Sequence, residues 1–232
     1  MPFRCLRRSA VSPGLIFVLA ALLWPTVGHP ASYDEIVRQF AAIAFSSEDA
    51  MPGTIRRTNA FERWSGPPVL VRRFGRIDPV IHDVLAQLRV LSGLDIRIAE
   101  PANVFVHFGR SQCRGLGYTD RVDVTIGTIS TVHCVYEELA QTIGPTDDAC
   151  EYRPSIFCDL DFPVTYNEAD KIILRTTFDP RLRNGMTREE GMPIARQIIR
   201  ELYEEQYGPI REDDGERDAK TDAESTDTLS LP

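Results

Sequence analysis

The sequence predicts an α+β fold, in which a small, twisted, mixed β-sheet is covered by helices. Short segments with alternating apolar residues, such as "NVFVHF" and "RVDVTIGT", are typical of strands. Longer segments repeat apolar residues at helical spacing and begin at capping residues. The chain has 232 residues and a hydrophobic fraction of 43%, which suits one domain with a real core.

Three of the expected helices begin with a capping box, in which serine or threonine stands three residues before glutamate. These pairs are Ser32 with Glu35, Thr165 with Glu168, and Thr187 with Glu190. A further helix begins at Pro79, with Asp78 as its cap, and ends before Gly93. The helices are expected over residues 32–45, 79–92, 132–143, 165–178 and 187–207.

The strands are expected over residues 69–74, 94–99, 103–108 and 121–128. One strand lies between the first two helices, and the other three precede the helix at 132–143. The intervening "GRSQCRGLGYTD", residues 109–120, is predicted to be a loop. It is rich in glycine but lacks the Lys-Ser/Thr pair of a phosphate-binding loop.

Residues 1–30 have the three parts of a secretory signal peptide: the basic "RCLRRS", the apolar "GLIFVLAALLW" and the small-residue "TVGHPAS". We expect cleavage between Gly28 and Ala31, and an uncleaved anchor is the alternative. The apolar run is too short to span a bilayer comfortably. The protein is therefore expected to be exported, periplasmic or secreted, with no integral membrane span after cleavage.

The rest of the chain divides by composition. Residues 31–60 hold the first helix and a polar connector, and residues 61–207 hold the main domain. From Glu204 onward, ten acidic residues stand against three basic ones. Residues 208–232 are therefore expected to form a disordered acidic tail. There is no basic stripe with interleaved aromatic residues, so nucleic acid is not an expected partner.

Four cysteines remain once Cys5 is removed with the signal peptide: Cys113, Cys134, Cys150 and Cys158. An even number in an oxidising compartment predicts two disulfides, for which three pairings exist. We favour Cys113 with Cys134 and Cys150 with Cys158, because the second pair closes a short local loop. Zinc binding by the four cysteines is the alternative, but no CxxC spacing is present.

The segment "HCVYEELAQTIGPTDDAC", residues 133–150, has the spacing of a metzincin zinc site, HExxHxxGxxH, without its histidines. Glu137 stands at the first histidine position, Glu138 at the general base and Gln141 at the second histidine. Gly144 stands at the glycine that turns the chain, and Asp147 at the third ligand. The segment therefore resembles a zincin helix that has lost its zinc ligands.

Two later segments follow the metzincin order. "SIF", Ser155 to Phe157, stands where that branch has a Ser-x-Met-like turn under the metal, with Phe157 in place of methionine. The helix after it places Asp170, Ile173 and Phe178 where metzincins have a "D..I..LY" pattern. This resemblance implies a zincin-like fold with an active-site-type helix and C-terminal helices.

A nearer resemblance is to the bacterial family known as domain of unknown function 2927, over Phe61 to Leu202. It rests on "CVYEELAQTIG", "PSIFCD" and "LRTTFDPRLRNGMTREEGMPIARQII". The resemblance implies an exported, zincin-like domain without an established activity. This chain has Pro145 and Asp147 where members are expected to read closer to "GLxND".

The preferred interpretation is a non-catalytic envelope protein, or pseudoprotease, without a cofactor, whose degenerate site binds an unknown protein or envelope component. The alternative is a metallopeptidase-like hydrolase with Glu138 as general base. Its metal ligands would be Glu137, Gln141 and Asp147, whose oxygens suit Ca²⁺, Mg²⁺ or Mn²⁺ better than Zn²⁺. A third hypothesis is metal-free acid/base catalysis by Glu138 with Asp147.

Other polar residues are expected to be structural. His82, His107 and His133 are interpreted as structural or surface residues rather than ligands. The segment "DPRLRNG", residues 179–185, is interpreted as a turn in which Asp179 pairs locally, and an anion-binding loop is the alternative.

Overall fold

The computed structural model describes residues 30–45, 60–73, 79–109, 113–118, 121–127, 131–145 and 147–210. The predicted signal peptide, most of the connector and most of the acidic tail lie outside the described residues. The helices are α2 (Tyr33–Phe45), α3 (Pro79–Ser92), α4 (Thr131–Ile143), α5 (Glu168–Phe178) and α6 (Arg188–Tyr207). The strands are β1 (Val69–Arg73), β2 (Ile96–Ile98), β3 (Val104–Phe108), β4 (Arg114–Tyr118) and β5 (Arg121–Ile126). Within these ranges, no helix is long and apolar enough to cross a membrane.

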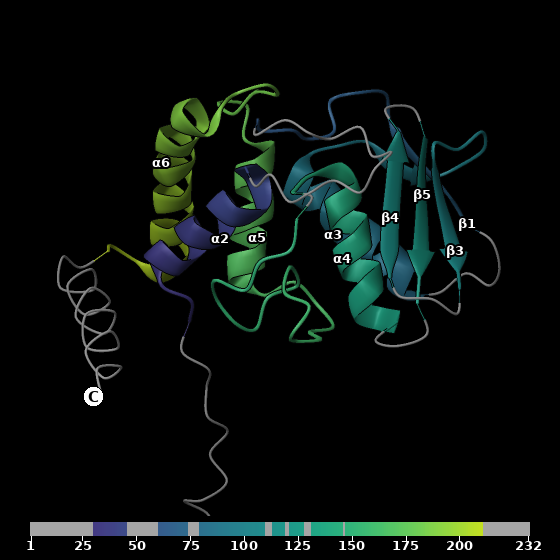
Figure 1. Ribbon diagram of the computed structural model, residues 1–232, viewed down its shortest axis with the longest axis horizontal. Coiled ribbons are helices and arrows are strands. Elements are labelled where there is room, and N and C mark those ends of the chain that lie inside the picture. The colour runs from purple at the N-terminus through teal and green to yellow at the C-terminus, as the bar shows by residue number, and fades with distance from the viewer. Residues whose placement is uncertain are drawn as a thin grey trace, which may run out of the picture. The chain divides into compact units, whose positions relative to one another are not determined.

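The strands form one mixed sheet in the order β2-β1-β3-β5-β4. The first four run parallel, and β4 pairs antiparallel with β5 at the edge of the sheet (Figure 1). The register places Gly115 of β4 opposite Val124 of β5. The predicted combination of a small mixed sheet with helices is thus confirmed.

Strand β4 corrects the prediction that residues 109–120 form a loop. Its sequence, "RGLGY", has two glycines and a low intrinsic strand propensity. Antiparallel pairing with the regular strand β5 supplies the hydrogen bonds that its own side chains do not predict. This strand forms the edge of the sheet beside α4.

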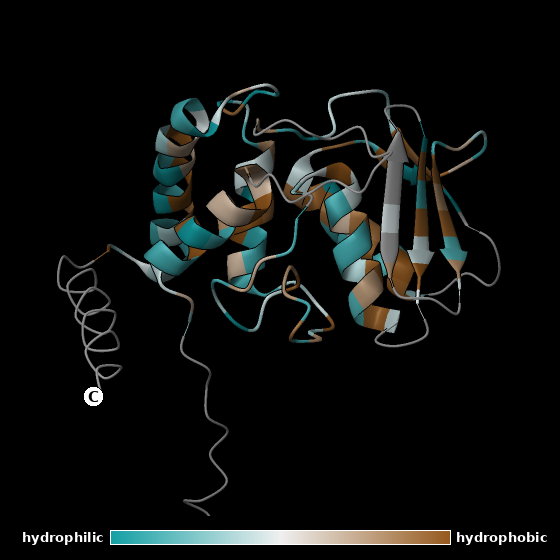
Figure 2. Ribbon diagram, viewed as in Figure 1, coloured by the Kyte–Doolittle hydropathy of each residue, from teal (hydrophilic) through white to brown (hydrophobic). Residues whose placement is uncertain are grey.

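Part of the core lies between the sheet and helices α3 and α4, which cover the same side of it (Figure 1), and the core continues among α2, α5 and α6. Helix α4 packs against β5 and β4, and α3 packs against β2. Alternate residues of β3 and β5 are buried: Val104, Val106, Val122, Val124 and Ile126. Figure 2 shows the corresponding alternation of apolar and polar residues along β5. Burial of each such side chain contributes about 1.5–3 kcal/mol to stability.

Two of the three predicted capping boxes are confirmed. Glu35 accepts hydrogen bonds from Ser32, and the Thr187 and Glu190 pair caps α6. The box predicted for Thr165 and Glu168 is wrong. The cap of helix α5 lies two residues later than expected, at Asn167, which forms a capping box with Asp170. Asn caps a helix as well as Thr does, and here Asp170 also binds a neighbouring turn, which the sequence pattern does not reveal.

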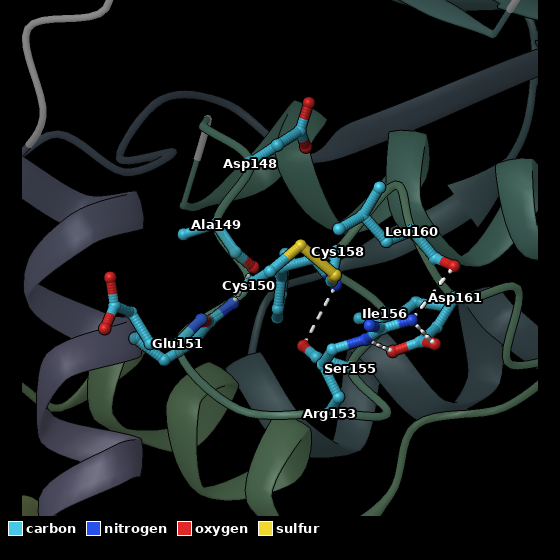
Figure 3. The surroundings of a disulfide bond; sticks show 12 residues. Asp148, Ala149, Cys150, Glu151, Arg153, Ser155, Ile156, Cys158, Leu160 and Asp161 are labelled. Atoms are coloured by element: carbon cyan, nitrogen blue, oxygen red, sulfur yellow. Dashed lines mark hydrogen bonds and ion pairs between the residues drawn. A yellow bond between two sulfur atoms is a disulfide. The ribbon is translucent and has the colours of Figure 1, made fainter. Parts of the chain in front are cut away.

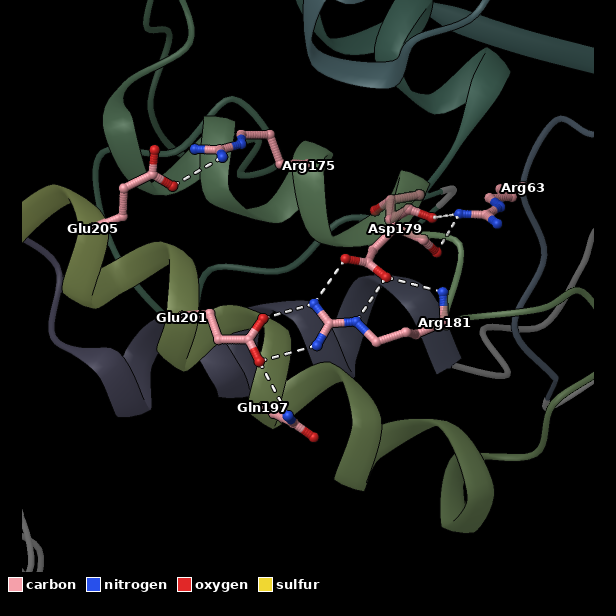
Figure 4. Close-up of polar contacts among 8 residues, drawn as sticks. Arg63, Arg175, Asp179, Arg181, Gln197, Glu201 and Glu205 are labelled. Atoms are coloured by element: carbon pink, nitrogen blue, oxygen red, sulfur yellow. Dashed lines mark hydrogen bonds and ion pairs between the residues drawn. The ribbon is translucent and has the colours of Figure 1, made fainter.

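Helices α2, α5 and α6 pack against one another. Figure 4 shows Arg181 between Asp179, at the end of α5, and Glu201 of α6. The local pairing of Asp179 with Arg181 agrees with the predicted turn. Arg63 is half-buried and donates to the backbone carbonyls of Thr177 and Asp179, which fixes the same turn from the other side.

The close approach of α2 and α6 depends on Gly191. A methyl group added there would lie 2.5 Å from Cζ of the buried Phe45. We expect Gly191→Ala to lower the free energy of unfolding by about 1–3 kcal/mol, as overpacking of a core does. Denaturant unfolding followed by circular dichroism measures this change. Gly66→Ala, whose new methyl would lie 3.9 Å from Trp64 Nε1, is the control, and equal midpoints for the two variants would contradict the packing.

Candidate functional site

Helix α4 is held at both of its sides. It follows β5 in the chain, and a disulfide joins Cys134 to Cys113 at the start of β4. On the other side, the buried Tyr166 donates a hydrogen bond of 2.8 Å to the backbone carbonyl of Tyr136. The helix therefore has a fixed position between the edge strand and the segment that precedes α5.

That segment, residues 149–167, is folded around a second disulfide, Cys150–Cys158, so both predicted pairings are confirmed. Figure 3 shows this disulfide with the ion pair of Arg153 and Asp161 below it. The Arg153 hydrogen bond holds the pKa of Asp161 below its usual range. A short loop closed by a disulfide and an ion pair has few conformations to lose, so its side chains are well positioned.

The predicted "SIF" turn is fixed to α5 by Asp170. This carboxyl is fully buried and accepts hydrogen bonds from Ser155 Oγ at 2.9 Å and from the Ile156 amide at 3.3 Å. Tyr152 and the Asn167 amide donate to it as well. Burial raises the pKa of Asp170 to about 6, and the donors oppose that shift, so the group is mainly ionised at pH 7.

Glu137 and Glu138 are both buried on α4, with exposed fractions of 4% and 5%. Glu138 lies against the edge strand, because a methyl group added at Gly115 would be only 3.0 Å from Glu138 Oε2. Burial raises the pKa of Glu138 to about 8, and the charges of Glu137, Asp148 and Asp159 add to the rise. Glu138 therefore holds a proton in most molecules at pH 7 and can exchange it near neutral pH.

The three oxygen ligands predicted from the sequence, Glu137, Gln141 and Asp147, make different contacts in the structure. Glu137 belongs to a group of metal-binding side chains, as described below. Gln141 donates a 2.5 Å hydrogen bond to Asp148, the neighbour of the predicted ligand Asp147. Asp147 itself is half-buried. Among the described residues, the compact group of metal-binding His, Cys, Asp and Glu side chains does not include Asp147.

His133, which was predicted from the sequence to be a structural or surface residue, is a further candidate for the site. It is buried with an exposed fraction of 3%, and its Nδ1 lies 3.1 Å from the carbonyl oxygen of Pro163. Its Nε2 lies 3.4 Å from Glu137 Oε2, one helical turn away. Asp159 completes the group, in which the ligand atoms lie within 4.8 Å of one another. Burial lowers the pKa of His133, but Glu137 raises it, and the net change is upward.

The sequence did contain a signal for this group. His133 and Glu137 are spaced i and i+4, which places them on one face of a helix. Asp159, however, lies 22 positions beyond Glu137 (159 minus 137), and no local pattern connects the two. His82 is exposed, and His107 Nε2 lies 3.0 Å from Asp123 Oδ1. His82 is therefore a surface residue and His107 is paired with a carboxylate, which agrees with the prediction.

The raised pKa of Glu138 predicts how stability depends on pH in protein kept metal-free with EDTA. The folded state binds this proton more tightly than the unfolded state, where the pKa is 4.5. The resulting stabilisation is present below about pH 4.5 and is lost as the pH rises to about 8. We expect Glu138→Gln to be more stable than wild type at pH 8, by on the order of a few kcal/mol, and the difference to shrink at pH 5.

Chemical unfolding at the two pH values measures this difference. The exposed Glu204→Gln is the matched control, since it makes the same substitution at a solvated position of a helix. A Glu138→Gln variant that is less stable than wild type at pH 8, or a control that behaves in the same way, would contradict the assignment.

Comparison with known protein families gives a match. Residues 121–197, from β5 into α6, match the family described as "Protein of unknown function (DUF2927)". None of the curated proteins and none of the solved structures matches the chain. The matched part contains Glu137, Glu138, the "SIF" turn and Asp170. Over these residues, the match agrees with the family resemblance that the sequence motifs indicate.

Proposed function

We propose that this protein is an exported, zincin-like binding protein that holds an extended polypeptide segment beside β4 without cleaving it. The observation that carries the proposal is the edge strand β4, which lies next to α4, with an exposed apolar segment on the other side of that helix. Two disulfides support export, because such bonds persist in oxidising compartments.

The zincin-like part of the proposal is supported by the arrangement of the elements. An antiparallel edge strand lies beside a helix that carries two buried glutamates. The "SIF" turn and the α5 aspartate, which the metzincin resemblance singled out separately, are hydrogen-bonded to each other. The helix positions that bind zinc in metzincins are occupied by Glu137 and Gln141, and for this reason we propose binding rather than peptide hydrolysis.

The edge strand β4 and an exposed apolar segment border the N-terminal half of α4, and together they favour a polypeptide ligand. Of the described strands, only β5 pairs with β4, so the outer backbone groups of β4 face no strand. Such an edge adds an extended peptide through backbone hydrogen bonds. On the other side of α4, Leu160, Phe162 and Val164 are exposed by 67%, 58% and 60%.

Adjacent residues of α4 link these two features. Cys134 is bonded to Cys113 at the start of β4, while His133 contacts Pro163 in the middle of the apolar segment. Backbone groups and apolar side chains are thus presented on either side of the same helical turn. A ligand with both extended backbone and apolar side chains fits this combination.

Peptides selected from a displayed library against the purified protein test the proposal. We expect Leu160→Ser to weaken their binding about tenfold or more, the loss that follows when an apolar contact of about 1.5–3 kcal/mol is removed. Val90→Ser is the matched control, because Val90 is 83% exposed on α3. Hydrogen exchange should show new protection of the β4 amides in the complex. The absence of any binding peptide, or equal losses in the two variants, would contradict the proposal.

One observation favours a second candidate, a metallopeptidase-like hydrolase. The pKa of Glu138, about 8, suits a residue that exchanges a proton near neutral pH. Mass spectrometry of the same bound peptides distinguishes the candidates. Intact peptides are expected for the binding protein, and cleavage that disappears in Glu138→Gln would establish the hydrolase instead.

A further inference from the structure

Among the residues that the structure describes, no hydrogen-bond partner is found for two buried polar atoms on neighbouring turns of α4: His133 Nε2, which lies 3.4 Å from Glu137 Oε2, and Glu137 Oε1. Buried polar groups are nearly always satisfied, and an unsatisfied one costs about 1–3 kcal/mol. Both atoms belong to the group that Asp159 completes. We propose that His133, Glu137 and Asp159 bind a divalent transition-metal ion, for which Zn²⁺ is the best fit.

The orientation of the His133 ring supports this site. A carbonyl oxygen can only accept a hydrogen bond, so the contact with Pro163 places a proton on Nδ1. The Nε2 of the neutral ring then carries a lone pair and lies 3.4 Å from Glu137 Oε2. Metal-binding histidines have this arrangement, in which the second ring nitrogen donates to a backbone carbonyl or a carboxylate and fixes the tautomer.

The distances suit a tetrahedral ion. Zinc lies about 2.0–2.2 Å from nitrogen and oxygen ligands, so two ligand atoms of a tetrahedron are roughly 3.3–3.6 Å apart. His133 Nε2 and Glu137 Oε2 are 3.4 Å apart. The largest separation within the group is at most 4.8 Å. Asp159 is exposed, and a shift of the order of 1 Å brings its carboxylate to the same spacing.

The ligand set identifies the class of ion. One imidazole nitrogen with two carboxylates suits Zn²⁺ and its first-row neighbours. Calcium takes six to eight oxygen ligands, and magnesium requires an octahedral oxygen shell. Three protein ligands leave one tetrahedral position for water or for a donor atom of a bound molecule. The site also differs from the metal ligands predicted from the sequence, Glu137, Gln141 and Asp147, because the two sets share only Glu137.

A bound ion would join α4 to the segment that carries the exposed apolar residues. Asp159 is adjacent to Leu160, and Phe162 packs edge-on against the His133 ring with centroids 5.5 Å apart. The metal would therefore fix the border of the proposed polypeptide site. The site does not depend on that function, because neither Leu160 nor β4 supplies a ligand.

Titration of ZnCl₂ into EDTA-treated protein, followed by calorimetry, tests the site. We expect one Zn²⁺ per chain, with CaCl₂ binding far more weakly. Asp159→Asn should weaken zinc binding by at least about 100-fold, since loss of an outer-shell partner alone costs 10–100-fold. Asp159 is exposed, so this variant is expected to fold. Nitrogen NMR of the imidazoles should show Zn²⁺ shifting the His133 Nε2 signal.

Asp147→Asn is the matched control, because it removes the same charge from the ligand predicted by sequence spacing. Its zinc affinity should equal that of wild type. The absence of stoichiometric Zn²⁺ would overturn the proposal and leave His133 and Glu137 as a buried ion pair. Wild-type affinity in Asp159→Asn, or its loss in Asp147→Asn, would overturn it as well. None of these outcomes affects the peptide-binding test.

Discussion

The buried carboxylate of Asp170 is the contact on which the arrangement of the candidate site depends. An ionised carboxylate is costly to bury unless several donors surround it, and this one is fully buried among four. The donors are Tyr152 Oη, Ser155 Oγ and the backbone amides of Ile156 and Asn167. Within the described residues, no basic side chain forms an ion pair with it. A single side chain thus caps α5 and holds the turn that leads to Asp159.

The buried glutamates of helix α4 differ from Asp170 in their hydrogen bonding. Asp170 is satisfied by donors, whereas Glu137 and Glu138 are buried with few of them, and burial raises the pKa of both. Such an arrangement lowers stability near neutral pH unless a proton or a cation neutralises the charge. The two disulfides hold the helix and the loop in place despite this cost. Buried acidic groups with raised pKa values are common at functional sites.

Periodicity and cysteine number were sufficient to predict most of the fold. Helices α2, α3, α4 and α6, four of the strands and both disulfide pairings agree with the expectation. Strand β4 could not be predicted, because its glycine-rich sequence depends on pairing with β5. At the candidate site, spacing singled out Glu137, which is buried on α4, and Asp170, which is hydrogen-bonded to the "SIF" turn. It missed His133 because Pro163 and Asp159, which orient and complete its group, are distant in sequence and meet it only in the folded chain.

The most direct test of this account is hydrogen exchange of the backbone amides in Asp170→Asn compared with wild type. An asparagine keeps the shape but replaces one acceptor with a donor, which leaves buried donors unsatisfied and costs at least about 3 kcal/mol. The account predicts that protection falls mainly over residues 150–166 and at the start of α5, while α2 and α6 keep theirs. Unchanged protection over residues 150–166, or an equal loss throughout the chain, would contradict the claim that Asp170 positions the site.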